Sequence, residues 1–313
     1  MSLARDTLLW ASSNTWLRRH VPRWRFVRAA TRRFMPGETL DDAVREVRRF
    51  AERRLATMLT QLGENVGTEA EAIAVGDDYL AVLDRIAEEG LDTEISVKLT
   101  HLGYDLDPEI AWKNLARLLD RASERGNWVW IDMEASGYVD GTLAIYRRAL
   151  ERSPDVGVCL QAYLHRTAAD VGALLPLAPS FRLVKGAYRE PPDVAVPRKS
   201  DMDSSFLRLS EKLLAEKAAG RLRRLAVATH DVDLIGRIDR VAGSRGWPLD
   251  SFEIQMLYGI RQADQLRYAK EGRPTRCLIA YGPAWYPWYV RRLAERPANV
   301  WFLLRNLVAR RPA

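Results

Sequence analysis

Two adjacent arginines near the C-terminal end, Arg291 and Arg292, are the first candidates for chemistry in this sequence. Each guanidinium is planar and permanently charged, so a neighbouring pair can bind a carboxylate through paired, charge-assisted hydrogen bonds. In a chain this rich in arginine, two arginines on a solvated helix face are the commoner explanation. The pair therefore indicates an anion site only if other polar residues converge on the same place.

Such residues occur at the ends of short apolar runs. Those at or near the C-terminal end of a run are Lys98, Asp132, Gln161, Thr229, His230 and Gln255. Burying an unpaired charge costs several kcal/mol, so a charge within an apolar run needs a reason. A structural ion pair explains Lys98 or Asp132 alone equally well. Several polar residues at one rim, followed by the arginine pair, favour an active site.

The elements that would position these residues alternate along the chain. Apolar runs occupy residues 55–62, 95–100, 128–133, 156–162, 181–187, 224–230, 252–257 and 276–282. Amphipathic segments occupy residues 68–89, 108–125, 140–152, 167–175, 203–218 and 231–245, with a last helix expected at 284–296. Doubly apolar strands alternating with helices predict a parallel sheet, and eight units predict a closed α/β barrel of the (β/α)8 type. Such barrels carry their chemistry at the C-terminal ends of the strands.

An arginine-rich, helical segment at residues 1–54 is expected to precede the barrel, which would span residues 55–313. Thr39 can cap a helix, and Asp42 follows three residues later. An apolar stripe at helical spacing then consists of Val44, Val47 and Phe50. These features predict a helix that ends near Arg54. The last helix of the barrel, which carries the arginine pair, is expected to lie over the C-terminal face.

Composition narrows the class of protein. The chain has 313 residues, 47% hydrophobic and 28% charged, which is typical of a soluble globular protein with a large core. Its net charge of +7 comes largely from arginine, but no zinc-finger spacing, aromatic RNA-binding signature or tandem repeat supports nucleic-acid binding. No stretch is apolar for long enough to cross a membrane. The basic N-terminus leaves open a peripheral contact with an anionic membrane surface.

The two cysteines, Cys159 and Cys277, lie inside apolar runs without metal-ligand neighbours. We expect buried thiols, no metal site and a reducing cytosol.

Several longer motifs appear in a fixed order. They are LGE at 62–64, VKLT with Lys98, IDME with Asp132, LQAY with Gln161, RLVKGAY at 182–188, ATHD at 228–231, FEIQMLYGIR at 252–261 and VRRLAER at 290–296. In this order they resemble the proline dehydrogenase family of flavin-dependent barrel enzymes, from about residue 36 to the end of the barrel. RLVKGAY and the double-arginine helix are the most specific of them.

The resemblance implies FAD, bound without the GxGxxG turn of a Rossmann unit, which this sequence lacks. The flavin contacts that it implies are Gln161, Arg182, Lys185, Gly186, Ala187, Thr229, His230 and Gln255. It implies that Arg182 lies near flavin N5, where a donor stabilises negative charge. The substrate-binding residues that it implies are Lys98, Asp132, Leu257, Leu278, Trp288, Arg291, Arg292 and Glu295. Among these, the two arginines would hold a carboxylate, Glu295 would orient them, and Lys98 and Asp132 would form a polar wall.

The sequence departs from the family pattern in the expected substrate pocket. Leu278 and Trp288 stand where the family usually has tyrosine, and Ala280 stands where proline is usual. Losing the first tyrosine removes a hydroxyl that could bond to Asp132, which would leave a buried acceptor in need of another partner. The two substitutions also predict a pocket of altered shape.

The resulting expectation is a flavoenzyme that oxidises L-proline to 1-pyrroline-5-carboxylate by hydride transfer to N5 of FAD. One alternative is the same chemistry on another cyclic or secondary-amine amino acid, such as hydroxyproline, a substituted proline or a biosynthetic intermediate. A second alternative is a non-catalytic barrel that serves as a binding protein. The resemblance further implies a quinone as electron acceptor and a cytoplasmic enzyme, with membrane contact at the inner face left open.

Overall fold

The computed structural model describes Asn14 and residues 34–286. Its strands are β1 Ala56–Gln61, β2 Thr93–Val97, β3 Val129–Ile131, β4 Val156–Gln161, β5 Ser180–Val184, β6 Arg224–Ala228, β7 Glu253–Leu257 and β8 Thr275–Tyr281. Every neighbouring pair is parallel, and β8 pairs with β1, so the sheet closes in sequence order. The predicted eight-stranded α/β barrel is confirmed.

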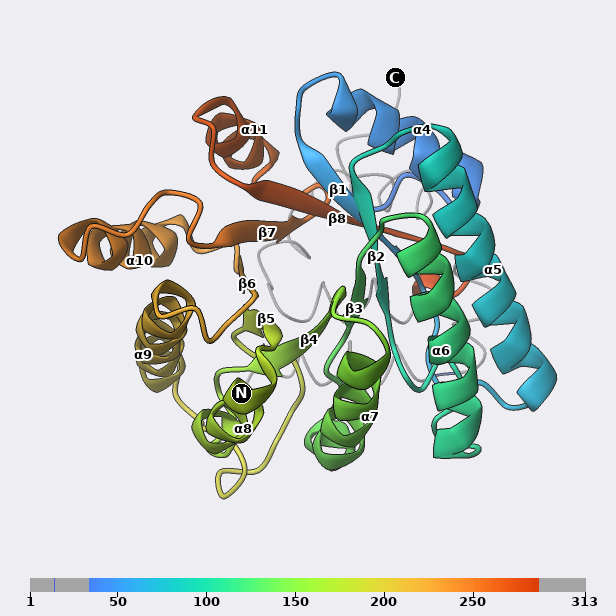
Figure 1. Cartoon of the computed structure of the whole chain (residues 1–313), viewed down its shortest axis with the longest axis horizontal. Coiled ribbons are helices and arrows are strands. Elements are labelled where there is room, and N and C mark those ends of the chain that lie inside the picture. Colours follow the sequence, from blue (N-terminus) through green and yellow to red (C-terminus); the bar gives the residue numbers. More distant parts are fainter. Residues whose placement is uncertain (1–13, 15–33, 287–313) are drawn as a thin grey trace, which may run out of the picture.

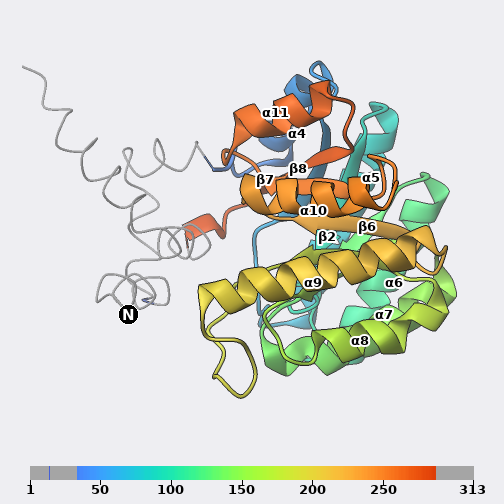
Figure 2. The same cartoon turned by 90° about the vertical axis from the view of Figure 1, so that its left-hand side faces the viewer.

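Helices surround the strands on the outside (Figure 1). They are α4 Leu40–Ala51, α5 Glu69–Glu88, α6 Pro108–Glu124, α7 Val139–Arg152, α8 Thr167–Leu174, α9 Lys199–Ala218, α10 Val232–Ser244 and α11 Gln262–Lys270. Figure 2 shows α9, α10 and α11 following one another along one side of the barrel. Among the described helices, none is both long enough and apolar enough to cross a membrane.

Helix α4 forms as the sequence predicts. The Thr39 hydroxyl accepts a hydrogen bond from the backbone N–H of Asp42, and the Asp42 carboxylate reaches back to the Thr39 backbone, which completes a capping box. Val47 and Phe50 are buried in the main core of the barrel. Helix α4 therefore belongs to the outer helical layer, and the proposed division of the chain at residue 54 stays a prediction.

Some elements differ from the prediction. Helix α11 was not predicted, because only Gln265 and Tyr268 are buried on it and no side chain caps its start at Arg261. Helix α9 begins four residues earlier than expected, at Lys199. The expected last helix lies mostly outside the described residues, whose final two, Trp285 and Tyr286, are helical.

Alternate side chains of each strand face the outer hydrophobic core and the barrel interior. On β2, Ile95 and Val97 face outward into the main hydrophobic core. Glu94 and Ser96, which alternate with them, contact Arg224 and Arg182 across the barrel. Lys98, just beyond the strand, pairs with Asp132 at the end of the neighbouring β3. Because alternate residues of a strand share a face, these three lie in successive layers of the barrel interior. The C-terminal layer holds the candidate site.

Candidate active site

A compact charged cluster lies in the barrel interior, where side chains from β2, β3 and β5 meet. The Asp132 carboxylate accepts hydrogen bonds at Oδ1 from the Ser96 hydroxyl, at 2.8 Å, and from Arg182 Nη1, at 3.1 Å. Lys98 Nζ lies 3.7 Å from Asp132 Oδ2, and Arg182 Nη2 donates to Ser96 Oγ at 3.0 Å. The structure thus brings together Lys98, Asp132 and Arg182, three of the residues predicted from the sequence.

Asp132 is the counter-ion for two cations. The Arg182 side chain is only 4% exposed, so its charge depends on the carboxylate beside it. The acceptor expected to lack a tyrosine hydroxyl finds Ser96 and Arg182 instead. Sequence reasoning missed Ser96, although its position two residues before Lys98 places both on the same face of β2.

Several buried polar atoms have no hydrogen-bond partner among the described residues, and Arg182 Nε and Gln255 Oε1 are two of them. Native structures rarely leave buried polar atoms unpaired, so such atoms point to a bound group. Gly186 adopts a φ of 124°, and a Cβ at this position would overlap the ring of Tyr163. These features fit a planar cofactor with hydrogen-bonding edges, which the resemblance implies.

Other predicted cofactor residues link the ends of neighbouring strands. Gln161 Nε2 donates to the Glu134 carbonyl at 2.8 Å. His230 Nε2 accepts from the backbone N–H of Leu257 at 3.0 Å, so a neutral His230 carries its proton on Nδ1. Thr229 is buried, and its hydroxyl accepts from the backbone N–H of Asp231 at 3.2 Å. These bonds fix the rim of the barrel around the charged cluster.

Lys185 is held from the side of α9 and α10. Its ammonium lies 2.5 Å from Asp203 Oδ1 and 2.9 Å from Asp231 Oδ2. Burial would raise the pKa of both carboxyls, but the Lys185 ammonium holds each pKa below its ordinary value. Two carboxylates thus fix the position of Lys185, whose contact with a cofactor stays a prediction. Ala187, two residues on, is exposed.

The apolar candidates lie on β7 and β8. Leu257 and Leu278 are partners in the register of these strands, and both are half-buried. Leu278 also packs against an interior cluster that consists of Met58, Trp128, Trp130 and Ala226. The remaining candidates, which are Trp288, Arg291, Arg292 and Glu295, lie outside the described residues.

An ionic cluster fills the barrel interior on the N-terminal side of the site. Glu94 Oε1 lies 2.8 Å from Arg224 Nη1 and 3.1 Å from Arg276 Nη2. Glu253 Oε2 lies 3.2 Å from Arg224 Nη2 and 3.3 Å from Arg276 Nε. Burial opposes ionisation of Glu253, but the guanidiniums of Arg276 and Arg224 outweigh it and hold the pKa of Glu253 below its ordinary value. Sequence reasoning missed this cluster, although its charges interrupt apolar strands as Asp132 does.

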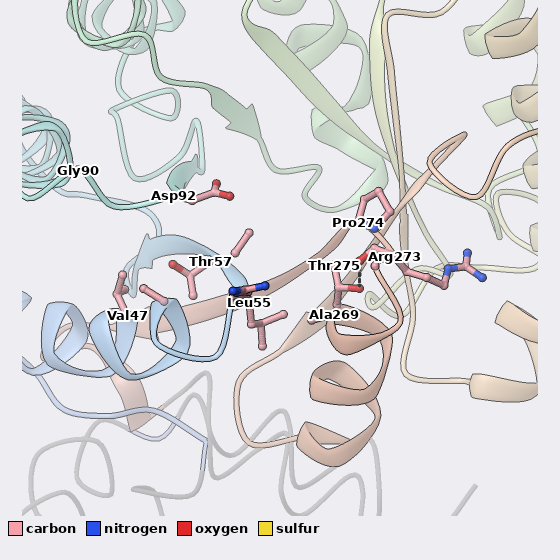
Figure 3. Close-up of a pocket in the computed structure, with 13 residues that line it drawn as sticks. Val47, Leu55, Thr57, Gly90, Asp92, Ala269, Arg273, Pro274 and Thr275 are labelled. Atoms are coloured by element: carbon pink, nitrogen blue, oxygen red, sulfur yellow. Dashed lines mark hydrogen bonds between the residues drawn. The ribbon is translucent and has the colours of Figure 1, made fainter.

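A cavity of about 510 Å³ opens at the N-terminal end of the barrel, between α4, α11, β1 and β8 (Figure 3). Val47, Thr57 and Asp92 line it, whereas the Arg273 side chain points away from them. Arg273 Nη1 instead pairs with Asp239 on α10, at 2.6 Å. Barrel enzymes place their chemistry at the opposite end, so this cavity is separate from the candidate site.

His101, in the turn after β2, explains the glycine of the LGE motif. A Cβ on Gly63 would overlap the His101 imidazole, which is only 8% exposed. Its Nδ1 has no hydrogen-bond partner among the described residues. Burial and the nearby Lys98 ammonium lower the pKa of His101 to about 4, while Glu64 acts in the opposite direction. His101 is therefore neutral at pH 7.

We expect His101 to make the fold acid-sensitive. The unfolded chain binds a proton at this histidine below its ordinary pKa of 6.5, while the folded chain resists protonation down to about 4. Stability from this residue is thus complete above pH 6.5 and falls by up to about 3 kcal/mol as the pH drops towards 4. Urea unfolding between about pH 7 and pH 5 should show a smaller loss of stability for H101Q than for the wild type. H165Q, at an exposed histidine, is the control; equal pH slopes for all three proteins would contradict the assignment.

Comparison with known proteins agrees with this arrangement. A family model described as "Proline dehydrogenase" matches residues 43–305. Proline dehydrogenase 1 of Bacillus subtilis strain 168 is 37% identical over 306 residues, which cover 98% of this chain and 99% of the relative. The chain belongs to the proline dehydrogenase family. A proline dehydrogenase of Deinococcus radiodurans is 34% identical over 281 residues, covering 88% of this chain and 89% of that relative.

Solved proline utilization A structures share the barrel. The protein from Bdellovibrio bacteriovorus, inactivated by N-propargylglycine, superposes with a TM-score of 0.80 at 23% identity and covers 94% of this chain. A Bradyrhizobium japonicum proline utilization A mutant gives 0.71 at 22% identity, with the same coverage. This chain spans about a third of the length of both proteins, 36% in each case. All the candidate residues lie within the segment that the proline dehydrogenase model matches.

Proposed function

We propose that this chain is an FAD-dependent dehydrogenase that oxidises L-proline to 1-pyrroline-5-carboxylate. The observation that carries the proposal is the cluster of Lys98, Asp132 and Arg182 at the C-terminal end of a barrel of this family. The family motifs assign cofactor binding to Gln161, Lys185, Gly186, Ala187, Thr229, His230 and Gln255. They would hold the cofactor, whose flavin N5 supplies the hydride acceptor when FAD is bound.

Arg182 would provide fixed positive charge in the site. Its guanidinium is buried, and its Nη1 and Nη2 are already bonded to Asp132 and Ser96. A donor that is positioned before reaction stabilises developing negative charge without reorganising during the step. Its Nε–H has no hydrogen-bond partner among the described residues.

The substrate would be held by charge at one end and by apolar contact along its ring. We assign the carboxylate to Arg291 and Arg292, with Glu295 orienting them, on the strength of the motif alone. Leu257 and Leu278 offer adjacent apolar side chains on β7 and β8 for the ring, and Trp288 is assigned to the same pocket from the sequence. The substrate must lose its amine proton before hydride leaves the adjacent carbon, because the nitrogen lone pair forms the new C=N bond.

Anaerobic addition of L-proline to the purified, FAD-loaded protein is expected to bleach the visible absorbance of the oxidised flavin. The carbon next to the ring nitrogen is the hydride source, so the bleaching should not require oxygen. Stopped-flow spectrophotometry measures the rate. The panel should include trans-4-hydroxy-L-proline, because Leu278 is smaller than the tyrosine usual in the family.

Each outcome of this panel has a separate meaning. Bleaching by hydroxyproline but not by proline would transfer the proposal to the alternative substrate. A protein that cannot be loaded with FAD would overturn the enzymatic proposal and favour a non-catalytic barrel. We assign reoxidation to a quinone. The many arginines in residues 1–54 support a contact of this segment with the inner face of the membrane from the cytoplasm.

A further inference from the structure

Trp130 occupies a prepared slot in the barrel interior. It lies on β3, two residues before Asp132, and is fully buried. Its indole N–H donates to Glu94 Oε2 at 2.8 Å, which fixes the ring from the side of the ionic cluster. Gly157, its register partner on β4, leaves room for the ring, because a Cβ there would overlap the indole. The ring is thus fixed by a hydrogen bond and by packing.

The guanidinium of Arg182 lies over this ring. Its Cζ is 4.8 Å from the Trp130 ring centroid, within the range of a cation–π interaction. That attraction is strongest for tryptophan and increases where water is excluded, as it is around a side chain that is 4% exposed. A second guanidinium, from Arg224 in the ionic cluster, lies 5.3 Å from the same centroid. The indole therefore connects the ionic cluster to the candidate active site.

The contacts of Arg182 define the orientation of its guanidinium. Nη1 and Nη2 are taken by Asp132 and Ser96, and the planar face rests on Trp130. Among the described residues, only Nε lacks a partner. Asp132 and Ser96 alone would still permit the plane to tilt about the line joining Nη1 and Nη2. Contact with the indole face removes that freedom.

We propose that Trp130 is a positioning residue that holds the Arg182 guanidinium in a fixed plane, so that its positive charge acts on the flavin from one orientation. Trp130 does not touch the substrate in this role and acts only through Arg182. The inference rests on the proposed FAD-dependent function. On this proposal the reduction potential of the bound flavin depends on Trp130, although Trp130 is as buried as an ordinary core residue.

The bland alternative is that Trp130 only fills space, and Trp128 provides a matched control for it. Trp128 lies two residues earlier on the same strand face, with its ring centroid 6.0 Å from that of Trp130. It is also buried, but it contacts Arg224, at 4.5 Å, and belongs to the layer of the ionic cluster. A W128F substitution therefore disturbs the packing of the interior without removing the face under Arg182.

The test is the midpoint potential of FAD bound to the wild type, W130F, W130L and W128F, with FAD affinity and melting temperature measured in parallel. Without the indole, the Arg182 guanidinium is no longer held in one orientation and stabilises reduced flavin less than it does in the wild type. We expect W130L to lose about tenfold in preference for reduced over oxidised flavin, which makes the two-electron potential about 30 mV more negative. W130F, which keeps a weaker aromatic face and loses the bond to Glu94, should lose about threefold. W128F should match the wild type.

Three results would overturn the inference. One is a wild-type potential in W130F and W130L, even with a lowered melting temperature. Another is an equal shift in W128F, which would assign the effect to general packing. The third is a shift from W130F of the same size in the R182L background, where no guanidinium remains to be positioned. A wild-type protein that binds no FAD would instead overturn the proposed function and this inference together. If W130L does not fold, W130F alone decides among these results.

Discussion

Replacing Asp132 with asparagine is expected to lower kcat/KM for L-proline roughly a hundredfold to a thousandfold, or by about 3–4 kcal/mol. Asparagine keeps the shape of the side chain but removes the charge that balances Arg182 and Lys98. Two cations would then share a largely buried site without their carboxylate. Steady-state kinetics on protein of known FAD content measures the loss.

D105N is the matched control for this substitution. Asp105 is an exposed carboxylate in the loop after β2, and its hydrogen bonds go to Asn65 and Tyr138 rather than to the charged cluster. Its neutralisation should leave kcat/KM within about threefold of the wild type. Equal losses in D105N and D132N would mean that any carboxylate at this end of the barrel matters, and a fully active D132N would remove Asp132 from the site.

Replacing Arg276 with methionine is expected to reduce the free energy of unfolding by about 3–5 kcal/mol at pH 7. Its guanidinium, only 8% exposed, contacts Asp92, Glu94 and Glu253 and donates to the Thr57 carbonyl at 2.8 Å. Methionine keeps the length of the stem but leaves the buried carboxylates with Arg224 alone. Denaturant unfolding of the two proteins gives the difference.

The effect of Arg276 should depend on pH in a defined direction. Arg276 helps to hold the pKa of Glu253 below its ordinary value of 4.5. A depressed carboxyl pKa adds stability above the unfolded value, and this contribution is lost as the pH falls through the folded one. The difference between R276M and the wild type should therefore stay constant from pH 7 to about pH 5 and shrink only as the pH falls below the ordinary value of 4.5.

R152M is the matched control, because Arg152 forms a two-point pair with Asp120 on the surface, with both bonds at 2.6 Å. Exposed pairs are screened by water, so its unfolding midpoint should barely change. A pH-independent loss in R276M would mean that packing of the arginine stem, and not its charge, stabilises the barrel.

The fold could be predicted because parallel barrel strands are buried on both faces and appear as apolar runs. One error in a strand boundary has a clear physical cause. Residues 95–100 were predicted for the second strand, which begins at Thr93, because Glu94 does not look like a core residue. Its charge is balanced by Arg224 and Arg276, which lie more than a hundred residues away. Helix α11 was missed because it buries too little apolar surface to form a stripe.

Some residues of the candidate site could likewise be predicted from the sequence, and others could not. Lys98 and Asp132 could be predicted, because a charge within a strand needs a partner and barrel closure brings strand ends together. Arg182 was predicted only from the resemblance to the family. Ser96 and Trp130 could not be predicted, since a small hydroxyl and a buried aromatic are ordinary core residues until their neighbours are known. The carboxylates that hold Lys185 come from α9 and from the start of α10, and no spacing along the chain indicates that they meet.

The slot between Gly157 and Trp130 also constrains how this sequence can diverge. A methyl group at position 157 would occupy space that the indole fills, so this position cannot gain a side chain while Trp130 keeps its size. A larger residue on β4 would become acceptable only in a lineage that had already replaced the tryptophan with a smaller side chain. Such a lineage would also need another side chain to support Arg182. A glycine at position 157 therefore indicates that the Arg182 guanidinium rests on a tryptophan at position 130.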